Sequence, residues 1–172
     1  GAFAVVSYDA RGQGGSARLL RTRRKGHVRD FADHVNDFET VMQEVVLPDC
    51  PPPYFVLAHS TGAIVALLSA ERLRTQIDRM VLTSPLFSLT WGSPKTLARL
   101  TGFLMHFGLG EAFVPGGSAP LAHAQPFAGN PVTSGPERYQ RALSLVQADP
   151  SIGIRRATIA GKDVTGNNDL IK

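Results

Sequence analysis

The turn that organises this sequence lies within Tyr54-Phe55-Val56-Leu57-Ala58-His59-Ser60-Thr61-Gly62, which runs into an Ala- and Leu-rich segment. The apolar residues before the turn predict a short buried strand over 54–58, and the segment after it predicts a helix over 61–74. A serine between strand and helix, with small residues two positions before and after it, is typical of a nucleophile elbow, which exposes the serine hydroxyl. The simpler alternative is that Ser60 is an ordinary N-cap of the helix.

The composition indicates a soluble globular domain. The chain has 172 residues, of which 43% are hydrophobic and 19% are charged, enough for one domain with a core. No apolar run approaches the roughly 18 residues of a membrane span. Cys50 is the only cysteine, which excludes a disulfide framework within the chain and favours a cytoplasmic location. Because Gly1 leads almost at once into a strand-like run, we expect an internal part of a longer protein.

The net charge of +4 comes mainly from one basic stretch over residues 18–25. The basic residues are Arg18, Arg21, Arg23, Arg24 and Lys25. This stretch is interpreted either as a solvated loop or as a patch for anionic lipid head groups, which would place the protein peripherally at the inner membrane. Nucleic-acid binding is not expected, because the sequence has no zinc spacing, recognition-helix pattern or aromatic interleaving.

Strands and helices alternate over the first half of the chain. The expected elements are a buried strand over 2–8, a Gly-rich turn over 9–16, a helix over 31–46 capped by Asp30 and ended by Pro48, the strand and helix around Ser60, and a strand over 79–83. This order predicts an α/β fold, with a parallel sheet and helices on both faces. Since ligands bind beyond the carboxyl ends of such strands, we expect Asp9, Ser60 and Ser84 to share one rim.

The Gly-rich turn is not expected to bind a dinucleotide. Its glycines and Ala17 approach the G-x-G-x-x-G/A pattern, but that site needs a helix directly after the turn. Residues 18–25 are basic and not amphipathic, so we interpret the turn as a tight loop at the end of a strand.

The pattern changes after Phe87. Helices are predicted over 96–107 and 137–148, separated by a segment rich in Gly, Pro, Ala and Ser. Helices inserted after a sheet strand are typical of a lid. We therefore divide the chain into a partial core over 1–87, a helical lid over 88–150 and a tail over 151–172. The first lid helix carries the stripe Leu97, Leu100, Leu104 and Phe107, either lining an acyl path or simply packing.

Four motifs give the sequence a family resemblance. They are Asp9-x-Arg11-Gly12-x-Gly14-x-Ser16, the segment Gly26-His27-Val28 with Phe31, Asp33, Val35 and Asp37, the Ser60 turn, and Met80-Val81-Leu82-Thr83-Ser84-Pro85-Leu86-Phe87. Together they resemble serine hydrolases of the α/β-hydrolase fold, and in particular bacterial lysophospholipases related to monoglyceride lipases. The resemblance covers about residues 1–152.

The resemblance implies a lipid-ester substrate and a Ser–acid–His triad, with no cofactor. Ser60 would attack the ester carbonyl, and the backbone N–H of Thr61 would be one oxyanion-hole donor. The resemblance makes His27 a structural residue of its motif, and we expect His59 to pack or orient rather than catalyse. The five histidines show no metal-ligand spacing, so no metal is expected.

The sequence departs from the family where the rest of the triad should be. Triad order in this fold is Ser, acid, His, and no histidine follows His123. Asp163, in a strand-Gly-x-Asp context, is the in-chain candidate for the acid. The second oxyanion donor would come from a strand before Gly1. We therefore expect the isolated chain to be inactive.

Two other functions stay open. One is a peptidase or a general esterase of the same fold. A peptidase should hold a carboxylate cluster for the substrate amine, and the lid offers only scattered acids, Glu111 and Glu137. The other possibility is a non-catalytic chain, either a truncated product that lacks the triad base or a binding module that uses its lid surface.

Overall fold

The computed structural model describes residues 3–22, 25–87, 94–113, 127–128, 133–149 and 156–157. In chain order the elements are β1 (Lys25–Gly26), α1 (Ala32–Val41), the π-helical η1 (Met42–Val46), α2 (Leu47–Asp49), β2 (Phe55–His59), α3 (Thr61–Leu73), β3 (Arg79–Thr83), α4 (Pro94–His106), the 3-10 helix η2 (Leu109–Glu111), α5 (Pro136–Ala148) and β4 (Arg156–Ala157).

The centre of the fold is the β2–α3–β3 unit. β2 and β3 are parallel neighbours, with Phe55 opposite Arg79 and His59 opposite Thr83. This confirms the predicted strand–helix–strand order and the parallel pairing. Parallel strands need a crossover between them, and α3 supplies it. A separate short parallel pair joins β1 to β4.

The helix before β2 runs further than the sequence predicts. The N-cap residue is Phe31, one position after the expected Asp30, but the Oδ1 of Asp30 accepts a 2.8 Å hydrogen bond from the amide of Ala32. Pro48 does not end it, because helical structure continues through Asp49. The amide of Leu47 bonds to the carbonyl of Met42, five residues back. In a regular α-helix a proline ring clashes with the carbonyl four residues earlier. The π-helical turn just before Pro48 is wider than an α-helical turn, so the carbonyls ahead of the proline are placed differently.

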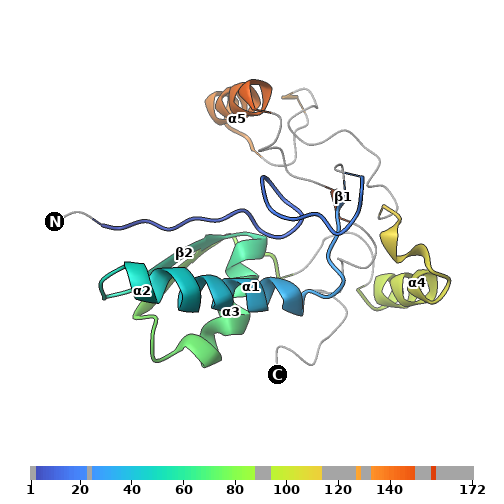
Figure 1. Ribbon diagram of the computed structural model, residues 1–172. Helices are drawn as coiled ribbons and strands as arrows, with labels where there is room; N and C mark the ends of the chain where they lie inside the picture. The colour runs from blue at the N-terminus through green and yellow to red at the C-terminus, as the bar shows by residue number, and fades with distance from the viewer. Residues whose placement is uncertain are drawn as a thin grey trace.

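The core lies between α1, α3 and one face of the β2–β3 pair (Figure 1). One cluster centres on Phe31 of the loop before α1 with Ile64 and Val65 of α3. A second cluster, Met42, Leu73 and Ile77, packs against Phe38, Val46, Val56 and Met80. The apolar start of α3 is therefore buried, as its sequence predicts.

The other face of the β2–β3 pair is exposed in the described part of the chain. Phe55, Leu57 and Val81 are 52%, 78% and 58% exposed. These side chains alternate with the inward-facing Val56 and Met80, as strand geometry requires. The helices described here thus cover one face of the pair.

The predicted first strand is wrong for the residues that are described. Residues 3–8 are extended but exposed and form no strand, with Phe3 82% and Val5 85% exposed. Apolar and β-branched residues favour a strand only when a neighbouring strand accepts their backbone hydrogen bonds. Among the described residues none pairs with this segment.

The later helices follow their predicted positions. α4 and α5 begin two and one residues before the predicted helices, at Pro94 and Pro136. In Figure 1 α5 stands apart from the α1–α3 layer, and α4 lies beyond the N-terminal end of α1. The tail 158–172 and the segments 88–93 and 114–126 lie outside the described residues.

Candidate active site

Ser60 lies in a strained turn between β2 and α3. Its backbone has φ 53° and ψ −120°, a region that residues with a side chain rarely adopt. Such strain costs about 1–3 kcal/mol and persists only where the surroundings enforce it. Ser60 occupies the N-cap position of α3, but its side chain makes no capping hydrogen bond, so it does not act as an ordinary side-chain cap.

The end of β3 and the segment after it hold the backbone of this turn on both sides. The amide of Ser60 donates a 3.0 Å hydrogen bond to the carbonyl of Thr83, and the amide of Leu86 lies 3.4 Å from the carbonyl of Ser60. Ser84 has a positive φ of 45°. Two neighbouring parallel strands thus end in serines with positive φ, and Ser60 and Ser84 share an edge of the sheet as predicted.

Asp9 does not join that edge through a strand, because residues 3–8 form none. Its Oδ2 accepts a 2.8 Å hydrogen bond from the amide of Gly15, and its carbonyl accepts one of 2.6 Å from the hydroxyl of Ser16. A Cβ at Gly14, where φ is +43°, would collide with the Asp9 carboxylate. Asp9 therefore organises its own loop.

The Ser60 hydroxyl belongs to a half-buried residue and has no hydrogen-bond partner within the described ranges. Thr61 is the first residue of α3, where a backbone N–H has no intrahelical acceptor. That amide is available to an anion beside Ser60. The elbow motif places a small residue at position 62. A Cβ at Gly62 would meet no described atom within 4 Å, so the described contacts do not explain why a small residue is required there.

His59 contacts β3 rather than Ser60. Its Nδ1 lies 3.0 Å from the hydroxyl of Thr83, and that hydroxyl donates a 3.2 Å hydrogen bond to the carbonyl of Ala58. His59 lies on the exposed face of β2, opposite Thr83. Its side chain is therefore engaged with the neighbouring strand.

The other described histidines lie in different surroundings. His27 is buried, and burial lowers its pKa, as do Arg29 and Lys25. Burial also lowers the pKa of His34, whose ring packs edge-on against Phe31 at 5.5 Å. His106 contacts Phe107 on α4.

A complete triad is not seen within the described residues, where no histidine or carboxylate bonds the Ser60 hydroxyl. His123 and the candidate acid Asp163 lie outside them.

Arg18 takes part in the Gly-rich loop instead of facing solvent. Its guanidinium donates hydrogen bonds to the carbonyls of Gln13, Gly14 and Ser16 at 2.7, 2.6 and 2.8 Å. Lys25 places its Nζ 5.3 Å from the centre of the Phe113 ring, a cation–π distance. Two of the five residues of the basic stretch thus have partners inside the chain.

Sequence reasoning missed an ion-pair cluster between the Gly-rich loop and α1. Arg11 bonds Asp37 through Nε to Oδ2 at 2.8 Å and through Nη2 to Oδ1 at 2.5 Å, and its Nη1 lies 3.2 Å from Asp33. The hydrogen bond from Arg11 holds the pKa of Asp37 below its usual value. The signal was present: carboxylates spaced i, i+4 share one helix face.

Helix α4 exposes much of its apolar surface. Phe103 and Phe107 are 61% and 63% exposed, with ring centres 4.7 Å apart. Leu100 is exposed, whereas Leu104 is half-buried. The side chain of Leu97 lies outside what the structure describes.

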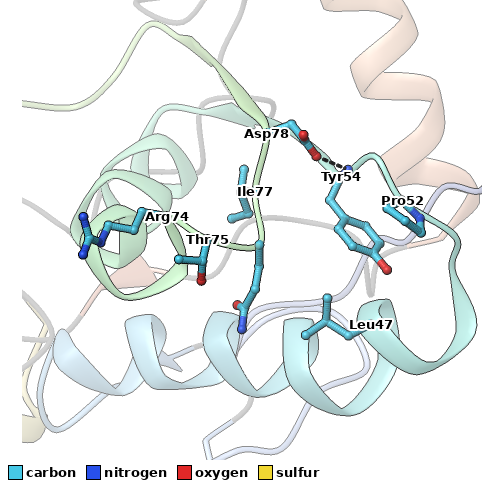
Figure 2. A pocket seen from close by; sticks show the side chains of 8 residues that line it. Leu47, Pro52, Tyr54, Arg74, Thr75, Ile77 and Asp78 are labelled. Atoms are coloured by element: carbon cyan, nitrogen blue, oxygen red, sulfur yellow. Dashed lines mark hydrogen bonds between the residues drawn. The ribbon is translucent and has the colours of Figure 1, made fainter.

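A pocket of about 490 Å³ lies at the opposite end of the strands from Ser60 (Figure 2). It is lined by Leu47, Pro52, Tyr54, Arg74, Thr75, Gln76, Ile77 and Asp78. Asp78 accepts a 2.8 Å hydrogen bond from the amide of Tyr54, which joins the starts of β2 and β3. The lining contains no serine, cysteine or histidine, so we assign it no part in nucleophilic chemistry.

The described ranges hold neither a candidate metal site nor a helix suited to cross a membrane. No group of three His, Cys, Asp or Glu side chains there is arranged to hold a metal ion. None of the helices there combines the length and apolar character of a bilayer-crossing segment.

Comparison with known proteins gives consistent results. The family described as serine aminopeptidase, S33, matches residues 2–161. The chain is 33% identical to lysophospholipase L2 of Escherichia coli K12, over 94% of this chain and 50% of that protein. It is 33% identical to monoglyceride lipase of Rattus norvegicus, over 60% of this chain and 32% of that protein.

A solved structure supports the fold. A thermostable carboxyl esterase from Bacillus coagulans, in complex with glycerol, aligns over 92% of this chain and 51% of its own, with a TM-score of 0.58 and 16% identity. The expected α/β-hydrolase fold is therefore confirmed. The chain spans half the length of the Escherichia coli relative.

Proposed function

Because this chain belongs to the serine aminopeptidase S33 family and has an α/β-hydrolase fold, we propose that it carries the nucleophile of a lipid-ester hydrolase. The substrate is the acyl ester of a lysophospholipid or a monoacylglycerol. The names of the similar proteins, lysophospholipase L2 and monoglyceride lipase, support this substrate class. The chain corresponds to half of such an enzyme.

The geometry of Ser60 is the observation that carries the proposal. A serine with φ 53° between a parallel strand and a helix, with no hydrogen bond from its hydroxyl to any described residue, is costly to maintain. A structural serine would gain nothing from that conformation. A nucleophile gains an exposed oxygen at the end of the sheet, beside the free amide of Thr61.

The reaction is an acyl transfer in two steps. The Ser60 oxygen attacks the ester carbonyl as a histidine takes its proton, and the amide of Thr61 bonds the developing oxyanion, where one such donor contributes about 3 kcal/mol. The histidine returns the proton to the departing glycerol oxygen. Water then cleaves the acyl-enzyme and restores the Ser60 hydroxyl. The base is proposed to lie in the half of the full-length relatives that this chain does not match, and Asp163 is the in-chain candidate for the acid.

We assign residues 1–87 to the core, 88–150 to a lid and 151–172 to a tail. The exposed phenylalanines of α4 support a lid that meets an acyl chain, since apolar surface of this kind is stabilised by apolar ligands.

The basic stretch 18–25 contributes peripheral contact with anionic lipid. Arg21 is the exposed basic residue among those of the stretch that are described, whereas Arg18 and Lys25 have partners inside the chain.

The family's description favours a second candidate, an aminopeptidase. Such an enzyme needs carboxylates near the nucleophile to bind the substrate amine. Glu111 and Glu137 are both exposed and lie on separate elements, η2 and α5. The ester hydrolase is therefore the better-supported function, and comparison of lysophosphatidylcholine with amino-acid p-nitroanilides separates the two.

The direct test is Ser60→Ala in a protein that contains this chain and extends over the full length of the relatives. We expect the variant to fold and to lose cleavage of p-nitrophenyl acyl esters and lysophosphatidylcholine. Ser144→Ala, on the exposed face of α5, is the matched control and should keep full activity. Retained cleavage by Ser60→Ala would refute the nucleophile assignment. The 172-residue chain alone is expected to be inactive, and turnover by it would contradict that part of the proposal.

A further inference from the structure

We propose that Thr83 is a positioning residue, which holds the strained turn at Ser60 through its side chain as well as its backbone. The inference rests on the proposed function, because it assigns a role around the Ser60 nucleophile. Neither the elbow motif nor the triad assigns a function to this threonine.

Thr83 contacts three consecutive residues of the turn. Its carbonyl accepts from the amide of Ser60 at 3.0 Å. Its hydroxyl donates to the carbonyl of Ala58 at 3.2 Å and lies 3.0 Å from Nδ1 of His59. The hydroxyl therefore contacts the carbonyl of Ala58 and the side chain of His59, the two residues that come before the strained Ser60.

The hydroxyl has a single proton, which decides the state of His59. If that proton goes to Ala58, the hydroxyl can only accept from His59, so His59 carries its own proton on Nδ1. The Nε2 atom is then unprotonated in the neutral ring. Thr83 thus fixes both the tautomer and the orientation of this imidazole.

Strain at Ser60 explains why such contacts matter. A residue at φ 53° keeps that conformation only when neighbouring groups over-determine it. The backbone bond from Ser60 to Thr83 survives any substitution at position 83, whereas the two side-chain bonds do not. Without them the strand ladder still holds the backbone, but the His59 side chain loses its partner on β3, the turn has fewer contacts that enforce its strain, and the Ser60 oxygen spends less time in its reactive position.

Three variants test the role in the full-length protein. Thr83→Val keeps the shape but removes the hydroxyl, and we expect kcat to fall about tenfold with KM unchanged, the effect of losing one or two hydrogen bonds. Thr83→Ser keeps the hydroxyl and should restore most of the rate. Thr75→Val, in the turn after α3 and lining the pocket at the far end of the strands, is the matched control and should leave kcat unchanged.

The imidazole supplies a readout that does not need catalysis. Nitrogen-15 NMR of His59 at pH 8 should show the proton on Nδ1 in the parent chain and a shift toward Nε2 in Thr83→Val. A parent ring protonated on Nε2, or an unchanged kcat in a folded Thr83→Val, would overturn the proposal. Activity that survives Ser60→Ala would instead refute the proposed function and leave the NMR test of Thr83 in force.

Discussion

Arg11 and Asp37, 26 residues apart, form a two-pronged ion pair that ties the Gly-rich loop to α1. Both side chains are about 30% exposed, and Asp33 adds a second carboxylate to the same guanidinium. Paired bonds between guanidinium and carboxylate fix geometry as well as adding energy. The loop that carries Gly12 and Gly14 therefore has a defined anchor on the helix.

The first prediction concerns this anchor. Arg11→Lys keeps the charge but cannot make two parallel hydrogen bonds to one carboxylate, so we expect a loss of about 1–2 kcal/mol in the free energy of unfolding. Urea denaturation measures it. Arg74→Lys is the control, because Arg74 pairs with Glu71 at 3.5 Å on an exposed surface and should change stability by less than about 0.5 kcal/mol. Equal losses of unfolding free energy in the two variants would show that the Arg11–Asp37 pair stabilises the fold no more than an exposed ion pair does.

The second prediction is that acid weakens the fold through His34. Burial lowers the folded-state pKa of His34, so its contribution to stability is complete above the unfolded pKa of about 6.5 and is lost as pH falls through and below that value. His34→Gln should therefore reduce the fall in unfolding free energy between about pH 7 and pH 5. The exposed His106 provides the comparison, and His106→Gln should leave the slope unchanged. A slope that is the same in His34→Gln and the parent would contradict the assignment.

The third prediction uses two glycines in opposite settings. Gly14→Ala forces a Cβ at φ +43° into the Asp9 carboxylate and should cost at least about 1–2 kcal/mol. Gly102→Ala lies within α4, where a Cβ meets nothing within 4 Å, and should stabilise by up to about 1 kcal/mol. Thermal unfolding of both variants checks the signs. A tolerated alanine at position 14 would mean that Asp9 does not hold the loop as described.

Features that depend on neighbouring residues in the sequence could be predicted, whereas features that depend on contacts between distant segments could not. β2, α3 and β3 follow from local periodicity and from the serine between small residues, and the structure confirms their order and pairing. The run 3–8 failed because a strand needs a partner, which periodicity does not supply. Pro48 failed as a helix stop because the π-helical turn before it depends on bonding that the residue type does not encode. Arg18 was counted as a surface charge, although the loop carbonyls around it form its partners only once the loop has folded.

The candidate site shows the same limit. Ser60 and Thr61 are consecutive residues of one turn, so the sequence alone predicts that they lie side by side. The contacts of Thr83 with Ala58 and His59 cross two strands and require the strand register, which the sequence alone does not give. The candidate acid Asp163 lies outside the described residues, so its position relative to Ser60 stays a prediction.

The central claim is that the Ser60 oxygen becomes acylated. The most direct measurement is peptide mapping by mass spectrometry, after the full-length protein is incubated with a fluorophosphonate that traps serine nucleophiles. We predict one adduct, on Ser60, that forms quickly in the full-length protein, is absent from Ser60→Ala and forms far more slowly in the 172-residue chain. An adduct on another residue, or a full-length enzyme that hydrolyses esters while Ser60 stays unmodified, would contradict the account.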